Sequence, residues 1–274
     1  MLLRRSWDRP SSASQILGLR IAKIRYALVA VFVAAACGNS PQSSPTAQTP
    51  SLAAPTFAIL VFSKTEGFRH DSIPAGLAAI REQGFEKGFS VVASEDASLF
   101  TDSSLANYKV VVFLSTTGDV LNIAQQGAFE RYIRAGGGFV GIHSAADTEY
   151  DWLFYGGLIG AYFAGHPDIQ TATVRVEVPL DPSMTGLPSA WVRTDEWYNF
   201  QKNPRGAVNV LATIDEATYS GGTMAPDHPI AWSRAYEGGR SFYTAGGHTA
   251  ESYAERLFAA HLGNAILWAA LGRQ

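Results

Sequence analysis

The segment 137–147, with the sequence GGFVGIHSAAD, constrains the fold of this chain most strongly. Phe139–Ile142 is apolar and β-favouring and follows glycines that end a helix, which predicts a short buried strand. Gly141 and Ala145 lie two residues before and two residues after His143. That spacing predicts a sharp strand-to-helix turn, because only small neighbours let the chain lift the central side chain above the sheet edge. His143 therefore stands where many α/β enzymes keep a nucleophile.

Apolar and amphipathic stretches alternate along the first half of the folded part. Strands are expected at Thr56–Ser63, Phe89–Ala93 and Lys109–Ser115, and helices at Ser72–Gly84 and Ala124–Ala135. Strand–helix alternation implies right-handed crossovers and a parallel sheet. We therefore expect an α/β fold, a flavodoxin-like three-layer sandwich with a mainly parallel central sheet. Its ligands would bind at the carboxyl ends of the strands.

The second half is richer in strands. They are expected at Thr173–Val178, Trp191–Phe200, Val208–Ile214, Ile230–Tyr236 and Ser241–Ala245. Gly238-Gly239 is a hairpin signal between the last two. Ser252–Ala270 predicts a closing helix.

The N-terminus predicts export. Arg20, Lys23 and Arg25 precede an apolar run of 11 residues, Tyr26–Ala36, which fits a signal peptide and is too short to span a membrane. The run ends in Ala-Ala-Ala-Cys37, similar to a bacterial lipobox, in which the cysteine is lipidated and becomes the mature N-terminus. Simple cleavage before Cys37 also satisfies the small-x-small rule and stays open as an alternative.

The predicted organisation is therefore a signal peptide (1–36), a lipidated Cys37 with a disordered tether (37–55) and one folded domain (56–274). The tether is rich in Ser, Pro, Thr, Gln and Ala and has no aromatic residue, so it cannot bury enough apolar surface to order itself. We expect an exported lipoprotein anchored to a membrane and facing the periplasm or the cell exterior.

Composition excludes two classes of function. Without the signal peptide, the chain has 15 basic and 23 acidic residues, a net charge of −8. This charge, together with the lack of a basic stripe, argues against nucleic-acid binding. Cys37 is the single cysteine. With cysteine at position 143, the segment 137–147 would match a class I glutamine amidotransferase. Without it the chain has no thiol nucleophile and is not a glutaminase.

Two histidines are expected to meet at the sheet edge. His70 lies in the loop after the first strand and His143 follows a later one, so both project from carboxyl ends of central strands and are expected to share a functional role. The alternative is that they are ordinary hydrogen-bonding loop residues, with Ser72 as a helix cap. No tight metal motif is present, but His70, His143, His166 and His248 together could hold a zinc or another transition metal.

The dipeptide Asp195-Glu196 offers one carboxylate to the same site. Neighbouring strand residues point to opposite faces, so only one can serve a given pocket, and we favour Glu196. An edge-strand charge pair is the alternative. The adjoining Trp197 and Tyr198 suit either sugar rings or a hydrophobic core.

Five motifs, in order along the chain, resemble the ThuA-like, trehalose-utilisation family. They are Lys64-Thr65-x-Gly67-Phe68-Arg69-His70-x-Ser72-Ile73, Gly137-Gly138-Phe139-x-Gly141-Ile142-His143-Ser144-Ala145, Gly165-His166-Pro167, Asp195-Glu196-x-Tyr198 and Tyr243-Thr244-x-Gly246-Gly247-His248-Thr249. The resemblance implies the fold of the class I glutamine amidotransferases without the cysteine nucleophile. It also implies a link to bacterial catabolism of sugars, including oxidised (keto) disaccharides. One departure is Glu66, where a small residue is frequent.

The leading hypothesis is an exported enzyme acting on a sugar or keto-sugar, with His143 as general acid/base near pH 7, His70 as a second polar group and Glu196 orienting one of them. Expected substrate-binding residues are Lys64, Arg69, Ser144, Asp195, Trp197, Tyr198, His166 and His248. A divalent metal is possible but not required by the sequence.

Two other hypotheses remain. The chain could be a non-catalytic carbohydrate-binding module, because a fold can outlast its catalytic function. Ser144 could also be a hydrolase nucleophile, although the turn would then require glycine where Ile142 stands.

Overall fold

A computed structural model describes residues 56–271. The predicted signal peptide, Cys37 and the tether lie outside the described residues, so the domain organisation and the anchor stay predictions. Within residues 56–271, no helix is both long and apolar enough to cross a membrane.

A mixed sheet forms the centre of the described part. Its nine strands lie in the order β2-β1-β3-β4-β11-β10-β9-β6-β7. The first five are parallel and have the flavodoxin-like beginning 2-1-3-4. The others extend the sheet in antiparallel fashion. The bounds are β1 (Phe57–Phe62), β2 (Phe89–Ser94), β3 (Val110–Leu114), β4 (Gly138–Ile142), β6 (Gln170–Val176), β7 (Ala190–Asp195), β9 (Asn209–Asp215), β10 (Pro229–Tyr236) and β11 (Gly239–Thr244).

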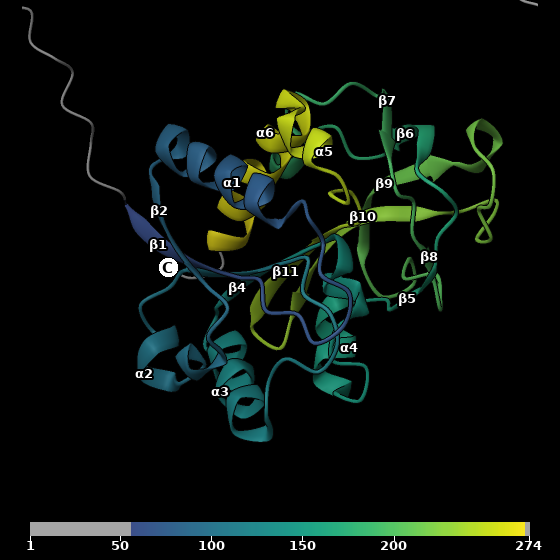
Figure 1. The fold of residues 1–274 in the computed structure, drawn as a ribbon. Helices are drawn as coiled ribbons and strands as arrows, with labels where there is room; N and C mark the ends of the chain where they lie inside the picture. Colours follow the sequence, from purple (N-terminus) through teal and green to yellow (C-terminus); the bar gives the residue numbers. More distant parts are fainter. Residues whose placement is uncertain (1–55, 272–274) are drawn as a thin grey trace, which may run out of the picture. The chain divides into compact units, whose positions relative to one another are not determined.

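Helices cover both faces of the parallel strands (Figure 1). On one face lie α1 (Ile73–Lys87), α5 (Ala250–Ala254) and α6 (Arg256–Ala270), and on the other α2 (Asp102–Leu105), α3 (Ile123–Arg134) and α4 (Leu153–Ile159). Both layers shield β3 and β4, whose ten residues are all buried. This confirms the three-layer α/β sandwich expected from the alternation.

Short elements complete the described part. The strands β5 (Phe163–Gly165) and β8 (Asn199–Phe200) form a separate antiparallel pair. Short 3₁₀ helices occur at η1 (Ala97–Leu99), η2 (His143–Asp147), η3 (Pro182–Met184) and η4 (Glu216–Thr218). The β10–β11 hairpin turns at Glu237 and Gly238, both with positive φ, as a type I′ turn requires.

Two predicted elements are interrupted. The strand expected at Trp191–Phe200 is divided into β7 and β8, and the residues between them leave the sheet. The closing helix is also divided, because Glu255 has an extended backbone between α5 and α6. Its carboxylate accepts hydrogen bonds from Trp191 Nε1 (2.5 Å) and Arg193 Nε (2.9 Å). These contacts tie the break to β7, which a helical pattern in the sequence does not reveal.

Candidate metal centre

The turn after β4 has the sharp geometry that its small residues predict. His143 has φ +53°, in the left-handed region that non-glycine residues adopt at a cost of about 1 kcal/mol or more. A Cβ added to Gly141 would lie 2.7 Å from Ile159 Cδ1 and 3.2 Å from Ala145 Cβ. A larger residue at position 141 would therefore have to displace Ile159, and glycine lets the backbone turn closely beneath His143 at the end of the strand.

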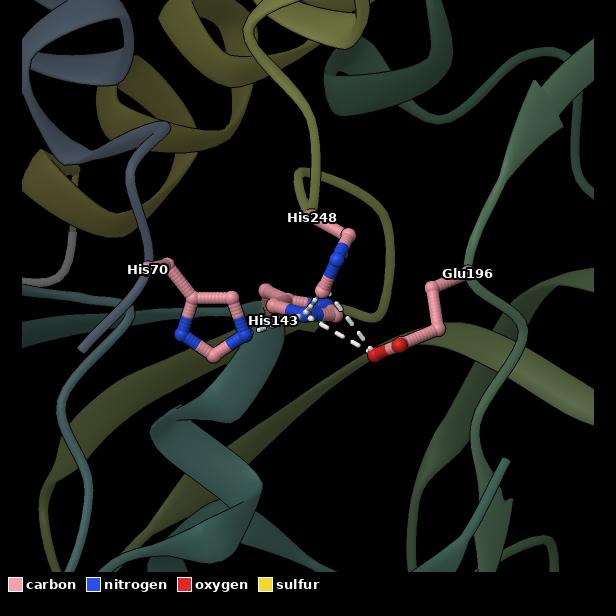
Figure 2. Close-up of side chains that lie close together, drawn as sticks. All are labelled: His70, His143, Glu196 and His248. Atoms are coloured by element: carbon pink, nitrogen blue, oxygen red, sulfur yellow. Dashed lines mark hydrogen bonds and ion pairs between the residues drawn. The ribbon is translucent and has the colours of Figure 1, made fainter. Parts of the chain in front are cut away.

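Four side chains converge at this point (Figure 2). His70 comes from the loop between β1 and α1, His143 from the turn after β4, His248 from the loop after β11, and Glu196 from the segment after β7. One ligand atom from each lies within 4.8 Å of the others. The parallel strands bring the three histidines to one edge, and the antiparallel extension supplies the carboxylate.

Four of the six separations between these atoms are close to the spacing of ligands around a metal ion, and all six are within 4.8 Å. His143 Nε2 lies 3.1 Å from His70 Nε2 and 3.3 Å from His248 Nδ1. Glu196 Oε2 lies 3.1 Å from His248 Nδ1 and 3.5 Å from His143 Nε2. Ligands bound tetrahedrally at about 2.0–2.1 Å are about 3.3 Å apart.

The ring hydrogen of His143 points away from the centre. His143 Nδ1 lies 2.8 Å from the carbonyl oxygen of Ala245, which can only accept, so Nδ1 carries the hydrogen and Nε2 presents a lone pair. His70 Nδ1 lies 3.4 Å from Ser144 Oγ, on the side away from the cluster. Metal-binding histidines usually have such a partner on the second nitrogen, because it fixes the tautomer.

Burial keeps two of the imidazoles neutral. Burial, with a smaller contribution from the neighbouring His248, lowers the pKa of His70 to about 4. Burial, with a contribution from His70, holds the pKa of His143 well below its usual value. A hydrogen bond to Glu196 instead raises the pKa of His248, so His248 takes up a proton more readily than His143 does. Neutral imidazoles are the form that binds metal.

Asp195 supports the cluster from beneath. It is fully buried, and its Oδ1 accepts the backbone N–H groups of Glu196 (2.9 Å) and His248 (3.1 Å). Its Oδ2 accepts from Gly247 N and Ser252 Oγ (both 2.8 Å) and pairs with Arg193 Nη1 at 3.0 Å. The two carboxylates of the dipeptide therefore face different surroundings. Glu196 faces the site, whereas Asp195, expected to bind substrate, does not line the cavity beside the cluster and instead fixes the backbone of two members of the cluster.

Tyr198 and His166 flank the cluster. Tyr198 Oη lies 3.0 Å from His143 Nε2, and burial raises the pKa of this phenol well above its usual value, so it stays a donor. His228 Nε2 lies 2.8 Å from the carbonyl oxygen of Tyr198 and holds it in place. His166, which is partly exposed, places Nδ1 3.0 Å from Glu196 Oε1.

The cluster opens into a cavity of about 340 Å³, here called the Tyr198 cavity. Its lining includes four expected residues besides His70, and three that were not expected, Phe68, Asp147 and Phe163. Phe68 and Asp147 lie within two segments that the sequence analysis identifies, 64–73 and 137–147. Their position in these segments could have marked both as candidate site residues. Burial raises the pKa of Asp147, and Tyr150 Oη donates to its carboxylate at 2.6 Å.

Several expected substrate-binding residues do not line this cavity. Lys64 pairs with Glu66 at 2.7 Å, and Arg69 pairs with Glu95 at 2.6 Å. Trp197 is fully buried and donates to the carbonyl oxygen of Gln170. Ser144 is also fully buried, behind His70. Their role in binding stays a prediction.

Ser72 differs from expectation. It occupies the N-cap position of α1 but forms no side-chain cap. Its hydroxyl instead donates to the carbonyl oxygen of Gly247 at 3.0 Å, which ties the His70 loop to the His248 loop. Pro74 within the first turn reduces the number of N–H groups that a cap would serve.

Comparison with known proteins identifies the family of the chain. The sequence model of the ThuA family, described as trehalose utilisation, matches residues 58–269. The chain belongs to the ThuA family. Comparison with curated proteins gives no match.

Solved structures show the same fold. A ThuA-like protein from Bacteroides uniformis is 25% identical, with a TM-score of 0.69 over 83% of this chain and 95% of that chain. A ThuA-like protein from Parabacteroides merdae is 19% identical, with a TM-score of 0.65, and the match covers 79% of this chain and 91% of that chain. A cytoplasmic protein from Salmonella typhimurium is 12% identical, with a TM-score of 0.56, and the match covers 78% of this chain and 99% of that chain.

Proposed function

We propose that this ThuA-family chain is a metal-dependent enzyme that acts on a sugar or keto-sugar. The observation that carries the proposal is the convergence on one point of three imidazole nitrogens and a carboxylate oxygen, 3.1–3.5 Å apart along the measured pairs. Family membership supports a role related to trehalose utilisation, and hence a carbohydrate ligand.

The donor set favours a first-row transition metal over magnesium or calcium, because imidazoles suit zinc, iron or nickel whereas the hard cations prefer oxygen. His70, His143, His248 and Glu196 would hold the ion. When bound, it would polarise a sugar carbonyl or lower the pKa of a water molecule.

A ligand role explains the position of His143 better than proton exchange near pH 7. Its side chain is fully buried and its pKa is lowered, so it is a poor acid at neutral pH. Asp147 and His166 line the Tyr198 cavity and are more open, so they would move protons to and from the substrate. Asp147 suits this task because burial raises its pKa towards the working range. Tyr198 Oη would donate a hydrogen bond to a developing oxyanion.

Metal analysis tests the centre. The mature protein, purified without chelator and supplied with zinc, manganese, iron or nickel, should retain about one equivalent of one metal, measured by mass spectrometry of the elements. His143→Ala and His248→Ala should lose it. His261→Gln, at a buried histidine outside the cluster, should keep it. Folded protein that retains no metal under any of these conditions would contradict the centre.

Turnover tests the reaction. Metal-loaded protein is incubated with trehalose and other disaccharides, each in its unmodified and its oxidised (keto) form. Mass spectrometry then detects the products. Asp147→Asn should lower kcat by about two to four orders of magnitude, while Asp151→Asn, at an exposed neighbour, should not. Binding by calorimetry without any product would favour a non-catalytic carbohydrate-binding module instead.

We also propose that the enzyme is an exported lipoprotein. The support is the sequence alone, namely the apolar run that ends in Ala-Ala-Ala-Cys37 and the uncharged tether after it. A lipid anchor at Cys37 would hold the folded domain at a membrane that faces the periplasm or the cell exterior.

A further inference from the structure

The metal cluster borders a second cavity. This space, about 300 Å³ and here called the Ile169 cavity, is lined by Asp71, Ile169, Ala250 and Glu251 among others. It shares Phe68, His70 and His248 with the Tyr198 cavity. The two cavities therefore adjoin, with Phe68, His70 and His248 along their common boundary.

Phe68 is placed as a partition rather than as a core residue. Its side chain is 66% exposed, and its ring meets the ring of His70 edge-on with centroids 4.8 Å apart. The backbone beneath is fixed, because Thr117 Oγ1 donates to the carbonyl oxygen of Phe68 (2.9 Å) and accepts from Gly67 N (3.2 Å). A rigidly mounted, exposed aromatic ring offers a flat face to a ligand.

Size and charge restrict what the Ile169 cavity can hold. Each cavity alone is at the lower limit of the 300–1,000 Å³ or so that holds drug-sized ligands, so each fits one ring and the pair fits two. Among the described residues that line the Ile169 cavity, Asp71 and Glu251 are carboxylates and none is Lys or Arg. Carboxylates accept hydrogen bonds from hydroxyl groups and repel phosphate.

We propose that the Ile169 cavity is a second subsite, which binds an uncharged, polyhydroxylated ring linked to the ring that reacts in the Tyr198 cavity. Phe68 lies between the two rings and sets their spacing. This inference rests on the proposed function, because it places the reacting ring beside the metal cluster.

Blocking the second cavity tests the subsite. Ala250 is exposed at the start of α5, so Ala250→Phe fills the cavity without disturbing the core. The matched control is Ala124→Phe, at an exposed alanine in the first turn of α3. Binding of trehalose and of glucose, each plain and in the keto form, is measured by calorimetry on metal-loaded protein.

Ala250→Phe should lower the ratio of disaccharide to monosaccharide affinity by about tenfold, and Ala124→Phe should leave it unchanged. Phe68→Ala should weaken binding of the disaccharide more than Phe85→Ala, whose ring is equally exposed (68%) but lies on α1 outside both cavities. Trehalose 6-phosphate should bind at least tenfold more weakly than trehalose.

The outcomes separate the two claims. If the wild-type protein binds or converts both sugars but Ala250→Phe leaves their ratio unchanged, the subsite is refuted and the proposed function stands. Tighter binding of the phosphorylated sugar would refute an uncharged ligand. If the wild-type protein neither binds nor converts any of these sugars, the proposed function fails and the subsite fails with it.

Discussion

Replacing Asp195 with Asn tests how the cluster is held together. The carboxylate receives four hydrogen bonds and an ion pair with Arg193, all from donors. Asparagine keeps one acceptor oxygen and turns an NH₂ group towards some of these donors. It also removes one of the two carboxylates that pair with the Arg193 side chain, which is 4% exposed, and leaves only Glu255.

The expected cost is large. Breaking a buried ion pair by removing one partner costs about 3–5 kcal/mol. For a domain of this size, each kcal/mol lowers Tm by about 2–4 °C, so Asp195→Asn should lower Tm by about 6–20 °C. Metal affinity should fall as well, because Asp195 fixes the backbones of Glu196 and His248.

Thermal unfolding followed by circular dichroism, with and without metal, measures both effects. The control is Asp102→Asn, whose partner Arg131 is on the surface and screened by solvent, so its Tm should not change measurably. A loss of 1 kcal/mol would already lower Tm by about 2 °C or more. A smaller change in Tm for Asp195→Asn would therefore refute the structural role given to Asp195. Unchanged metal affinity would refute its role in positioning the ligands.

Three further predictions follow from other parts of the chain. Gly141→Ala should destabilise the protein by about 1–3 kcal/mol in urea unfolding, because the added methyl collides with Ile159, and an unchanged midpoint would contradict the tight turn. Burial lowers the pKa of His261 to about 4, so the unfolded chain takes up a proton that the folded chain does not, and stability falls as the pH drops from about 6.5 to about 4. Over that pH range, the free energy of unfolding of His261→Gln should fall by about 3 kcal/mol less than that of the wild type. An equal fall in both proteins would contradict this prediction. Cys37→Ser should release the protein into the soluble fraction after cell fractionation, and a wild-type protein that is already soluble would favour simple cleavage instead.

The parallel half of the fold was predictable because its signals are local. Alternating apolar strands and amphipathic helices imply crossovers of one hand, and these place His70 and His143 at the same sheet edge. The small residues around His143 likewise predict the sharp turn, since the steric conflict at Gly141 is a short-range matter.

The rest of the site depends on long-range packing. The approach of Glu196 to His248 follows from the antiparallel extension, which brings β7 residues to a loop more than 50 positions away. Lys64 and Arg69 stand beside His70 in the sequence, yet each turns to a carboxylate outside the Tyr198 cavity. The interruption at Glu255 depends on contacts with β7 in the same way. Local periodicity carries no information on such pairings.

The most direct test of the metal centre is anomalous X-ray diffraction from crystals grown with a transition metal, collected on both sides of its absorption edge. We expect one strong peak about 2.0–2.2 Å from His70 Nε2, His143 Nε2, His248 Nδ1 and Glu196 Oε2, absent in crystals of His143→Ala. Well-ordered crystals with metal supplied and no peak among these four atoms would contradict the central claim.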